Sequence, residues 1–297
     1  MCDDITDREL DAHLKRRAIT RRGFALGASA TLAAGGLALS GCAMPLPEPG
    51  TITESAVRIP TPEGEIDGLF IHPVSGAHAA VIIWPDIHGV RPAFFDMARS
   101  LAGSGYSVIA ANPYYRTHQG RLFGDGESIR SEGGWEKVEA HYQSLSPATV
   151  NTDAAAIVAW LDAQEQVDSG RGIGAIGFCM TGSWTLRAAA ALPERVKAPA
   201  SFHGGGLVTE EPDSPHRLAG EMQGGVLIAI AENDHERQPE AQGELIAAFE
   251  AANLPAEIEV YEDAMHGWVP TDSRAHDPEL SARAWGRMLA LFEAQLS

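Results

Sequence analysis

The sequence predicts one α/β domain built on a doubly wound, mostly parallel β-sheet with helices on both faces. Short apolar runs alternate along the chain with stretches of helical spacing, which is the pattern of a parallel sheet with crossover helices. The runs at residues 79–84 and 225–231 are apolar at nearly every position, as in central strands buried on both faces. At 297 residues and 44% hydrophobic content, the chain is long enough to bury a large core.

Eight strands and five helices are predicted, and they alternate along most of the chain. The strands are expected at residues 51–60, 65–72, 79–84, 107–112, 172–176, 198–202, 225–231 and 257–261. The helices are expected at residues 93–105, 150–164, 183–192, 239–252 and 280–296. A Pro-Glu-Gly turn at Pro62–Gly64 separates the first two strands. The second helix is expected to begin with the capping cluster Asn151, Thr152 and Asp153. Residues 114–145 are polar and glycine-punctuated, which indicates an excursion over the top of the domain.

The first 50 residues have the pattern of an export signal. Arg21-Arg22 precede Phe24 and a weakly apolar Ala/Gly-rich run, which is typical of a twin-arginine signal. The run ends at Leu39-Ser40-Gly41-Cys42, which resembles a bacterial lipobox with Cys42 as the lipidated residue. Its many glycines argue against a membrane span, although cleavage nearby without lipidation is an alternative. We therefore expect a signal at 1–41, a Pro-rich tether at 42–50, a domain at 51–297, and a periplasmic or cell-envelope location.

Composition excludes several classes of partner and cofactor. The formal net charge of −18 argues against nucleic acid and against anionic membrane surfaces, so any membrane association is expected only through the lipidated N-terminus. Zinc-type Cys/His spacing and a phosphate-binding Gly-Lys-Ser/Thr loop are not found in the sequence, and neither a metal nor another cofactor is expected. Of the three cysteines, Cys2 lies in the signal and Cys42 is the lipid site, so Cys179 is the one thiol of the domain.

Cys179 occupies the position of a nucleophile in a tight strand-to-helix turn. It lies in Gly177-Phe178-Cys179-Met180-Thr181-Gly182, between a predicted strand and a predicted helix. Small neighbours allow the crowded backbone of such a turn, which exposes one reactive side chain. The alternative is a buried cysteine that ends a core strand.

An acid and a histidine follow two later strands. Asp234 comes after the strand at 225–231, and His266 comes after the strand at 257–261. Nucleophile, acid and histidine in this chain order at strand ends form a catalytic triad. A thiol needs an adjacent imidazole to take its proton, and the acid fixes the imidazole tautomer. Glu232 is the rival acid, and His235 is the rival base.

The loop after the strand at 79–84 completes the predicted site. Its sequence is Asp86-Ile87-His88-Gly89-Val90, and one backbone N–H of this loop should face the reacting carbonyl. The second donor should be the residue after the nucleophile. The oxyanion hole is therefore assigned to Ile87 and Met180.

These segments resemble the dienelactone hydrolase (carboxymethylenebutenolidase) family of the α/β-hydrolases. The likeness rests on Asp86–Val90, on Asn112-Pro113-Tyr114-Tyr115-Arg116, on Gly177–Met180, and on Asp234 with His266-Gly267. The resemblance implies an α/β-hydrolase fold and a Cys179–His266–Asp234 triad. It also implies that Asp86 is the acidic partner of the resting thiol, and that Tyr114 and Arg116 bind substrate, with Arg116 holding its carboxylate. Two positions depart from the family pattern: Thr181 replaces a small elbow residue, and Pro270 replaces a second carboxylate-binding arginine.

The resulting functional expectation is a carboxylic ester hydrolase that cleaves an ester or lactone through a thioester on Cys179. Its partner would be a small-molecule substrate. A broad-specificity carboxylesterase is the first alternative. A non-catalytic envelope lipoprotein that keeps the fold for binding is the second.

Overall fold

The computed structural model describes residues 8–15, 46–48 and 50–297. The twin-arginine motif and Cys42 therefore lie outside the described residues. The strands are β1 (Ile52–Thr61), β2 (Gly64–Pro73), β3 (Ala80–Trp84), β4 (Ser107–Ala111), β5 (Ile173–Phe178), β6 (Val196–Phe202), β7 (Val226–Ala231) and β8 (Ala256–Tyr261). The helices are α2 (Pro92–Gly103), α3 (Gly134–Tyr142), α4 (Pro147–Asp162), α5 (Gly182–Ala191), α6 (Glu232–Arg237), α7 (Ala241–Ala251) and α8 (Pro278–Gln295), with 3₁₀ turns η1 (Cys179–Thr181) and η2 (Pro215–Glu221).

The strands form one eight-stranded sheet in the order β1-β2-β4-β3-β5-β6-β7-β8. The β1–β2 and β2–β4 pairs are antiparallel, and the pairs from β4–β3 through β7–β8 are parallel. The chain steps outward from β3 to β4 and, after returning to β5, steps the other way through β6, β7 and β8. The direction of winding therefore reverses between β3 and β5, and ligands of such sheets bind at the carboxyl ends of the strands at this switch point. The predicted mostly parallel α/β fold is confirmed.

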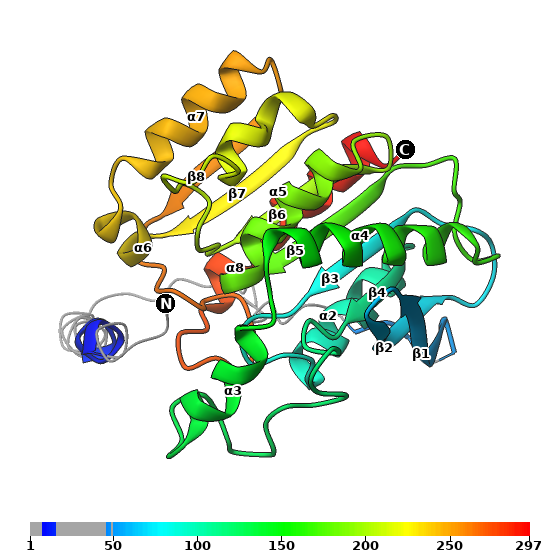
Figure 1. Ribbon diagram of the computed structural model, residues 1–297, viewed down its shortest axis with the longest axis horizontal. Coiled ribbons are helices and arrows are strands. Elements are labelled where there is room, and N and C mark those ends of the chain that lie inside the picture. The colour runs from blue at the N-terminus through cyan, green and yellow to red at the C-terminus, as the bar shows by residue number, and fades with distance from the viewer. Residues whose placement is uncertain (1–7, 16–45, 49) are drawn as a thin grey trace, which may run out of the picture.

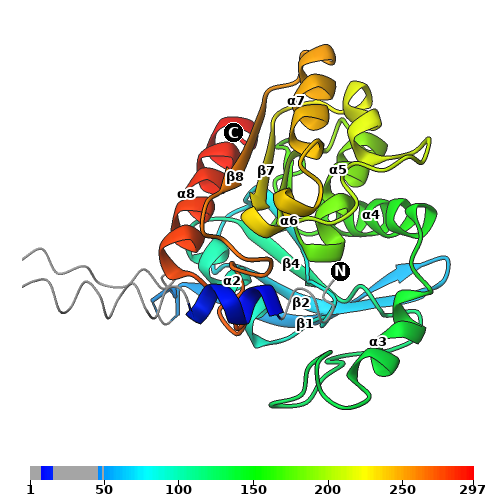
Figure 2. The same cartoon turned by 90° about the vertical axis from the view of Figure 1, so that its left-hand side faces the viewer.

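Helices cover both faces of the sheet (Figures 1 and 2). Helices α2 and α8 lie on one face, where Phe94, Met288 and Phe292 are fully buried against the strands. Helices α4, α5 and α7 lie on the other face, where Ile157 and Phe249 are buried. The uninterrupted apolar runs of the central strands follow from this arrangement, because side chains on both sides of each strand are removed from water.

Two expectations about helices are corrected. Helix α4 begins at Pro147, because Ser146 and Thr149 form a reciprocal capping box in which each side-chain oxygen accepts the other residue's backbone N–H. The predicted capping cluster at Asn151–Asp153 therefore lies inside the helix. Two stretches for which no helix was predicted, the excursion at 114–145 and the segment after β7, contain the short helices α3 and α6.

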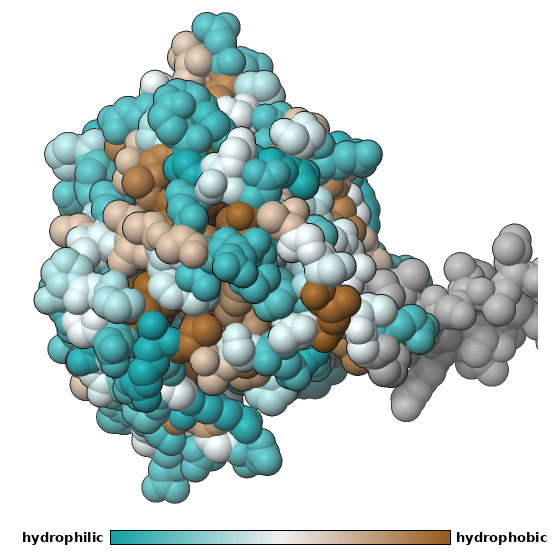
Figure 3. Space-filling model, turned by 90° about the vertical axis from the view of Figure 1, so that its right-hand side faces the viewer, coloured by the Kyte–Doolittle hydropathy of each residue, from teal (hydrophilic) through white to brown (hydrophobic). Residues whose placement is uncertain are grey.

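The end of the molecule at the amino ends of the parallel strands has a mixed surface. Hydrophobic side chains there occur in small groups between hydrophilic ones (Figure 3). Within the described residues, we find no helix that combines the length and apolar character needed to cross a bilayer.

Candidate active site

Cys179 lies at the carboxyl end of β5, in a backbone conformation that few side chains adopt. Its φ is 55°, in the left-handed region, and the 3₁₀ turn η1 leads from it directly into α5. A non-glycine residue held there is strained, and such strain collects at functional sites. A Cβ on Gly177 would approach the Thr181 carbonyl oxygen to 2.1 Å, and one on Gly182 would approach the Gly204 Cα to 2.4 Å. The glycines are therefore required by close backbone packing, as the sequence predicted.

Thr181, which departs from the family pattern, fits this turn through its hydroxyl group. Its Oγ1 accepts a hydrogen bond from the Phe178 N–H at 2.8 Å and lies 2.8 Å from the Trp84 carbonyl oxygen. The side chain is fully buried. Thr181 therefore ties the turn that carries Cys179 to the end of β3, and the larger side chain is accommodated by hydrogen bonds.

His266 and Asp234 form a hydrogen-bonded pair at the neighbouring strand ends. His266 Nδ1 lies 2.7 Å from Asp234 Oδ2, and the His266 backbone N–H donates to Asn233 Oδ1 at 2.8 Å. Burial by itself would raise the pKa of Asp234, but the His266 imidazole holds that pKa below its usual range. An ionised carboxylate beside Nδ1 keeps the Nδ1–H tautomer and leaves Nε2 as the basic nitrogen.

The structure distinguishes between the rival acids. Glu232 is turned away from His266, and its Oε2 accepts the Asp263 backbone N–H at 2.9 Å. Asp234 is the carboxylate that meets the histidine, because the first turn of α6 directs it toward the loop after β8. The Nδ1 of His235, the rival base, is buried and has no hydrogen-bond partner among the described residues.

The loop after β3 is held by a hydrogen bond from the Tyr114 side chain. The Tyr114 hydroxyl donates to the Ile87 carbonyl oxygen at 2.8 Å and lies 3.4 Å from Met180 Sδ. No acceptor among the described residues receives the Ile87 N–H, and Met180 lies in the first turn before α5, where N–H groups lack intrahelical acceptors. The fully buried Tyr114 thus contacts both residues of the predicted oxyanion hole. Its position differs from the expectation that it binds substrate, because no part of the side chain is exposed.

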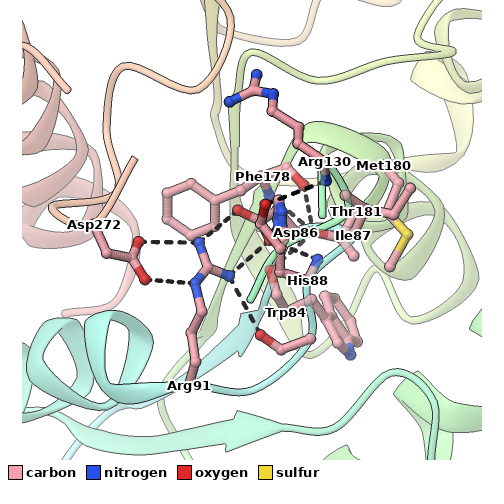
Figure 4. Close-up of polar contacts among 12 residues, drawn as sticks. Trp84, Asp86, Ile87, His88, Arg91, Arg130, Phe178, Met180, Thr181 and Asp272 are labelled. Atoms are coloured by element: carbon pink, nitrogen blue, oxygen red, sulfur yellow. Dashed lines mark hydrogen bonds and ion pairs between the residues drawn. The ribbon is translucent and has the colours of Figure 1, made fainter. Parts of the chain in front are cut away.

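Asp86 is held by Arg91, which the sequence analysis did not identify (Figure 4). Arg91 Nη1 and Nη2 lie 2.7 Å and 2.9 Å from the two Asp86 oxygens, and Oδ1 also accepts the His88 N–H at 2.9 Å. On its other side Arg91 contacts Asp272 with Nε at 2.7 Å. Burial would raise the pKa of Asp86, but Arg91 and His88 hold it well below the usual range.

These contacts give Asp86 an arginine partner that the resemblance did not imply. Both carboxylate oxygens face the Arg91 guanidinium, so the ionised acid is stabilised by an arginine. Asp272 lies in the loop that follows His266, which means that Arg91 connects the loop after β3 with the loop after β8. Arg91 lies at the N-terminus of α2. Its neighbours in the sequence do not indicate that its side chain is buried between Asp86 and Asp272.

Arg116 lies away from the predicted site. Its guanidinium makes two hydrogen bonds to Asp153 of α4, at 2.8 Å and 2.7 Å, and its Nε donates to Glu63 in the β1–β2 turn at 2.6 Å. The side chain is only 9% exposed and stacks over the ring of Tyr115. The expected role as a carboxylate-binding arginine is not supported by this position, because two carboxylates of the protein already occupy its donors.

His203 is a further residue that the sequence analysis missed. It ends β6, the strand between those that carry Cys179 and Asp234, and has a φ of 41°. Its ring lies edge to face with His266 at 4.9 Å and is 1% exposed. Burial lowers the pKa of His203 to about 3, so the ring is neutral near neutral pH. Its place directly before Gly204-Gly205 at a strand end could have indicated a site residue.

The structure therefore brings some of the predicted site residues together, but not all of them. Cys179, Asp234, His266, Ile87 and Met180 lie at the carboxyl ends of adjacent strands, with Asp86 close by. Tyr114 lies beneath them, and Arg116 is bonded to Asp153 of α4 and to Glu63 of the β1–β2 turn. Among the described residues, no group of three or more His, Cys, Asp or Glu side chains could hold a metal ion.

Comparison with known proteins places this geometry in a family. The dienelactone hydrolase family profile matches residues 66–296. A Synechocystis sp. protein assigned by name to the carboxymethylenebutenolidases is 29% identical over 250 residues, which cover 82% of this chain and 98% of that protein. The carboxymethylenebutenolidase of Rhodococcus opacus is 25% identical over 226 residues, covering 75% of this chain and 84% of that enzyme.

Solved structures agree with the sequence comparison. A Klebsiella pneumoniae protein assigned as a dienelactone hydrolase superposes with a TM-score of 0.69 at 25% identity, covering 82% of this chain and 98% of the other. The acylaminoacyl peptidase of Pyrococcus horikoshii shares the fold at 16% identity, with a TM-score of 0.61 over 83% of this chain and 42% of the peptidase. The chain described here therefore belongs to the dienelactone hydrolase family and is an α/β-hydrolase-fold enzyme that hydrolyses carboxylic esters or lactones.

Proposed function

We propose that the enzyme cleaves its ester or lactone through a covalent thioester on Cys179. The observation that carries the proposal is the strained turn that holds Cys179 at the switch point of the sheet, beside strand ends that supply the His266–Asp234 pair. A thiol with a pKa of about 8.5 is only a few per cent ionised near neutral pH, so the imidazole must take its proton.

The reaction proceeds in two stages. His266 Nε2 takes the thiol proton, and the thiolate sulfur attacks the carbonyl carbon to give a tetrahedral oxyanion. The Ile87 and Met180 N–H groups stabilise this oxyanion. Its collapse breaks the bond to the alcohol oxygen, which receives the proton from His266, and leaves an acyl thioester. A water molecule, deprotonated by His266, then attacks the thioester and releases the acid and the thiol.

We propose further that the preferred substrates carry no carboxylate next to the scissile bond. Arg116 is engaged by Asp153 and Glu63, and Pro270 is uncharged, so neither position of the family's carboxylate pair offers a free cation. The formal charge of −18 also disfavours the approach of anionic substrates. Neutral lactones and small neutral esters suit this setting better than an acidic dienelactone.

The thioester is tested by trapping the intermediate. A short-chain aryl ester such as p-nitrophenyl acetate should add one acetyl group to the peptide that contains Cys179, detected by mass spectrometry after rapid acid quenching. Cys179→Ala should lower kcat by about 10⁴-fold or more, as expected for the loss of a triad nucleophile. The control is the Cys2→Ser, Cys42→Ser double variant, which should keep full activity. Acyl transfer to another residue, with turnover kept in Cys179→Ala, would contradict the proposal.

We propose that the protein is exported by the twin-arginine route and anchored through Cys42. The support is the order Arg21-Arg22, weakly apolar run and Leu39-Ser40-Gly41-Cys42 in the sequence. Arg21→Lys with Arg22→Lys should hold the protein in the cytoplasm, and Cys42→Ala should release it from membranes. Fractionation of cells that express each variant measures both effects, and an intact N-terminus on the envelope-associated protein would contradict cleavage.

A further inference from the structure

The described N-terminal helix, residues 8–15, lies against α6, which carries Asp234, and against the loop that contains His266 and Arg274. Figures 1 and 2 show it on the side of the molecule where the parallel strands end, beside α6 and the loop before α8. Glu9 accepts a hydrogen bond from Asn233 Nδ2 at 3.2 Å and forms an ion pair with Arg237. Asp11 forms a second ion pair with Arg274 at 2.7 Å. The helix is therefore bonded to α6 and to the loop that follows His266.

Two of these partners, Asn233 and Arg237, also contact residues of the proposed triad. Asn233 donates to Glu9 with its Nδ2 and accepts the His266 backbone N–H with its Oδ1 at 2.8 Å. Arg237 pairs with Glu9, and its Nη1 lies 3.8 Å from Asp234 Oδ1. A shift of the N-terminal helix would therefore act on the residues that position the histidine and its acid.

The contact between the helix and the domain is complementary in charge. The first 11 residues contain five acidic side chains, of which Glu9 and Asp11 make the two ion pairs. Their partners are cations on the rim of the site in a chain whose formal net charge is −18. Leu10 and His13 are 2% and 6% exposed, so the helix also has a buried side. A helix of eight residues is not stable alone in water, so its order depends on such packing.

We propose that the N-terminal helix is an intramolecular restraint on the active site, which lowers the reactivity of Cys179 until the helix is displaced or removed. The basic rim formed by Arg237 and Arg274 is the docking surface, and the acidic segment of this same chain is its occupant. The segment precedes the proposed twin-arginine motif, so signal cleavage would remove the restraint together with the signal. The restraint is tested by two measurements, the rate of ester turnover and the rate of Cys179 alkylation. The turnover measurement rests on the proposed thioester function, and the alkylation measurement does not.

The test uses the full-length chain with Cys2→Ser and Cys42→Ser, so that Cys179 is the one reactive thiol. Glu9→Lys with Asp11→Lys reverses both ion pairs. Two exposed pairs together shift a docking equilibrium by about 2- to 30-fold. We expect alkylation of Cys179 by iodoacetamide, and turnover of p-nitrophenyl acetate, to accelerate by that factor. Glu48→Lys with Glu210→Lys changes the net charge equally without touching the helix, and should alter neither rate.

A charge swap separates docking from other effects of the substitutions. Asp11→Arg alone should accelerate alkylation, and adding Arg274→Asp should restore the slower rate. Alkylation rates that do not respond to the Glu9 and Asp11 reversals would overturn the restraint. Slower turnover in the reversed variant would also overturn it, because the helix would then support the triad. If all ester turnover is lacking but alkylation accelerates as expected, the restraint holds and the proposed thioester function fails.

Discussion

Thr181 joins the two loops of the active site by contacting Trp84, the last residue of β3. Its Oγ1 lies 2.8 Å from the Trp84 carbonyl oxygen and accepts the N–H of Phe178, the residue before Cys179, at 2.8 Å. β3 leads into the loop with Ile87, and β5 leads into the turn with Cys179. One buried hydroxyl therefore links the turn that carries Cys179 to the loop that should hold the oxyanion.

Thr181→Val should weaken both stability and catalysis. Valine keeps the shape but leaves the Phe178 N–H buried without its acceptor, which costs about 1–3 kcal/mol. Urea unfolding should report this loss, and kcat should fall more than KM rises, because the oxyanion donors are displaced relative to Cys179. Ser183→Ala removes a partly exposed hydroxyl of the same helix start and serves as the control. A variant with wild-type stability and kcat would contradict this role of Thr181.

Arg91→Met should destabilise the protein by about 3–5 kcal/mol, because it leaves the buried Asp86 carboxylate uncompensated. The pKa of Asp86 is depressed in the folded state, so the ion pair stabilises above the unfolded pKa of about 3.9 and is lost as pH falls toward the folded value. The stability difference between the variant and the wild type should therefore shrink below about pH 4. Arg99→Met breaks more exposed pairs with Glu54 and Asp96 and should cost less than about 1 kcal/mol.

Asp234→Asn should lower kcat by about 10⁴-fold, because an amide at this position favours the wrong imidazole tautomer. The matched control is Glu232→Gln, two residues earlier in α6, which loses one exposed contact with the Asp263 N–H. Its kcat should stay within about twofold of wild type, as expected for a side chain that takes no part in the triad. Comparable losses in the two variants would show that Asp234 is not the acid of the triad.

His203→Phe should change how stability depends on pH. The pKa of His203 is about 3 in the folded state, because the ring is buried. An unfolded histidine has a pKa of about 6.5. The unfolded state therefore binds more protons between these values, and the wild type should lose up to a few kcal/mol as pH falls from about 6.5 to about 3. The phenylalanine variant should lose less over the same range in urea titrations. Parallel curves for the two proteins would count against a neutral buried His203.

Arg116→Ala should lower stability without changing substrate selectivity. Its removal leaves Asp153, whose side chain is 5% exposed, without its bidentate partner, at a cost of about 3 kcal/mol. Paired aryl esters with and without a carboxylate should lose kcat/KM by the same factor. Glu63→Gln removes the exposed partner alone and should cost less than about 1 kcal/mol. A loss confined to the anionic ester would restore the carboxylate-binding role.

The order of the eight strands and of the five longer helices, and the residues that stand at the strand ends, could be predicted from the sequence alone. Apolar runs buried on both faces, such as those of β3 and β7, can be recognised locally because every position avoids water. The glycines around Cys179 and the chain order of Cys179, Asp234 and His266 follow from the same local patterns. The family match at residues 66–296 agrees with that prediction of the family.

The partners of the long polar side chains were decided only by the tertiary structure. Arg116 and Asp153 are 37 positions apart, and Arg91 and Asp272 are 181 apart. Local periodicity carries no information about such pairs, since a guanidinium can reach any carboxylate that the fold brings near it. The sheet order, with β3 beside β5, brings Trp84 to Thr181, and the strand order β5-β6-β7 places His203 between the strands that lead to Cys179 and Asp234. These relationships depend on which strands become neighbours, and that is a property of the packed sheet.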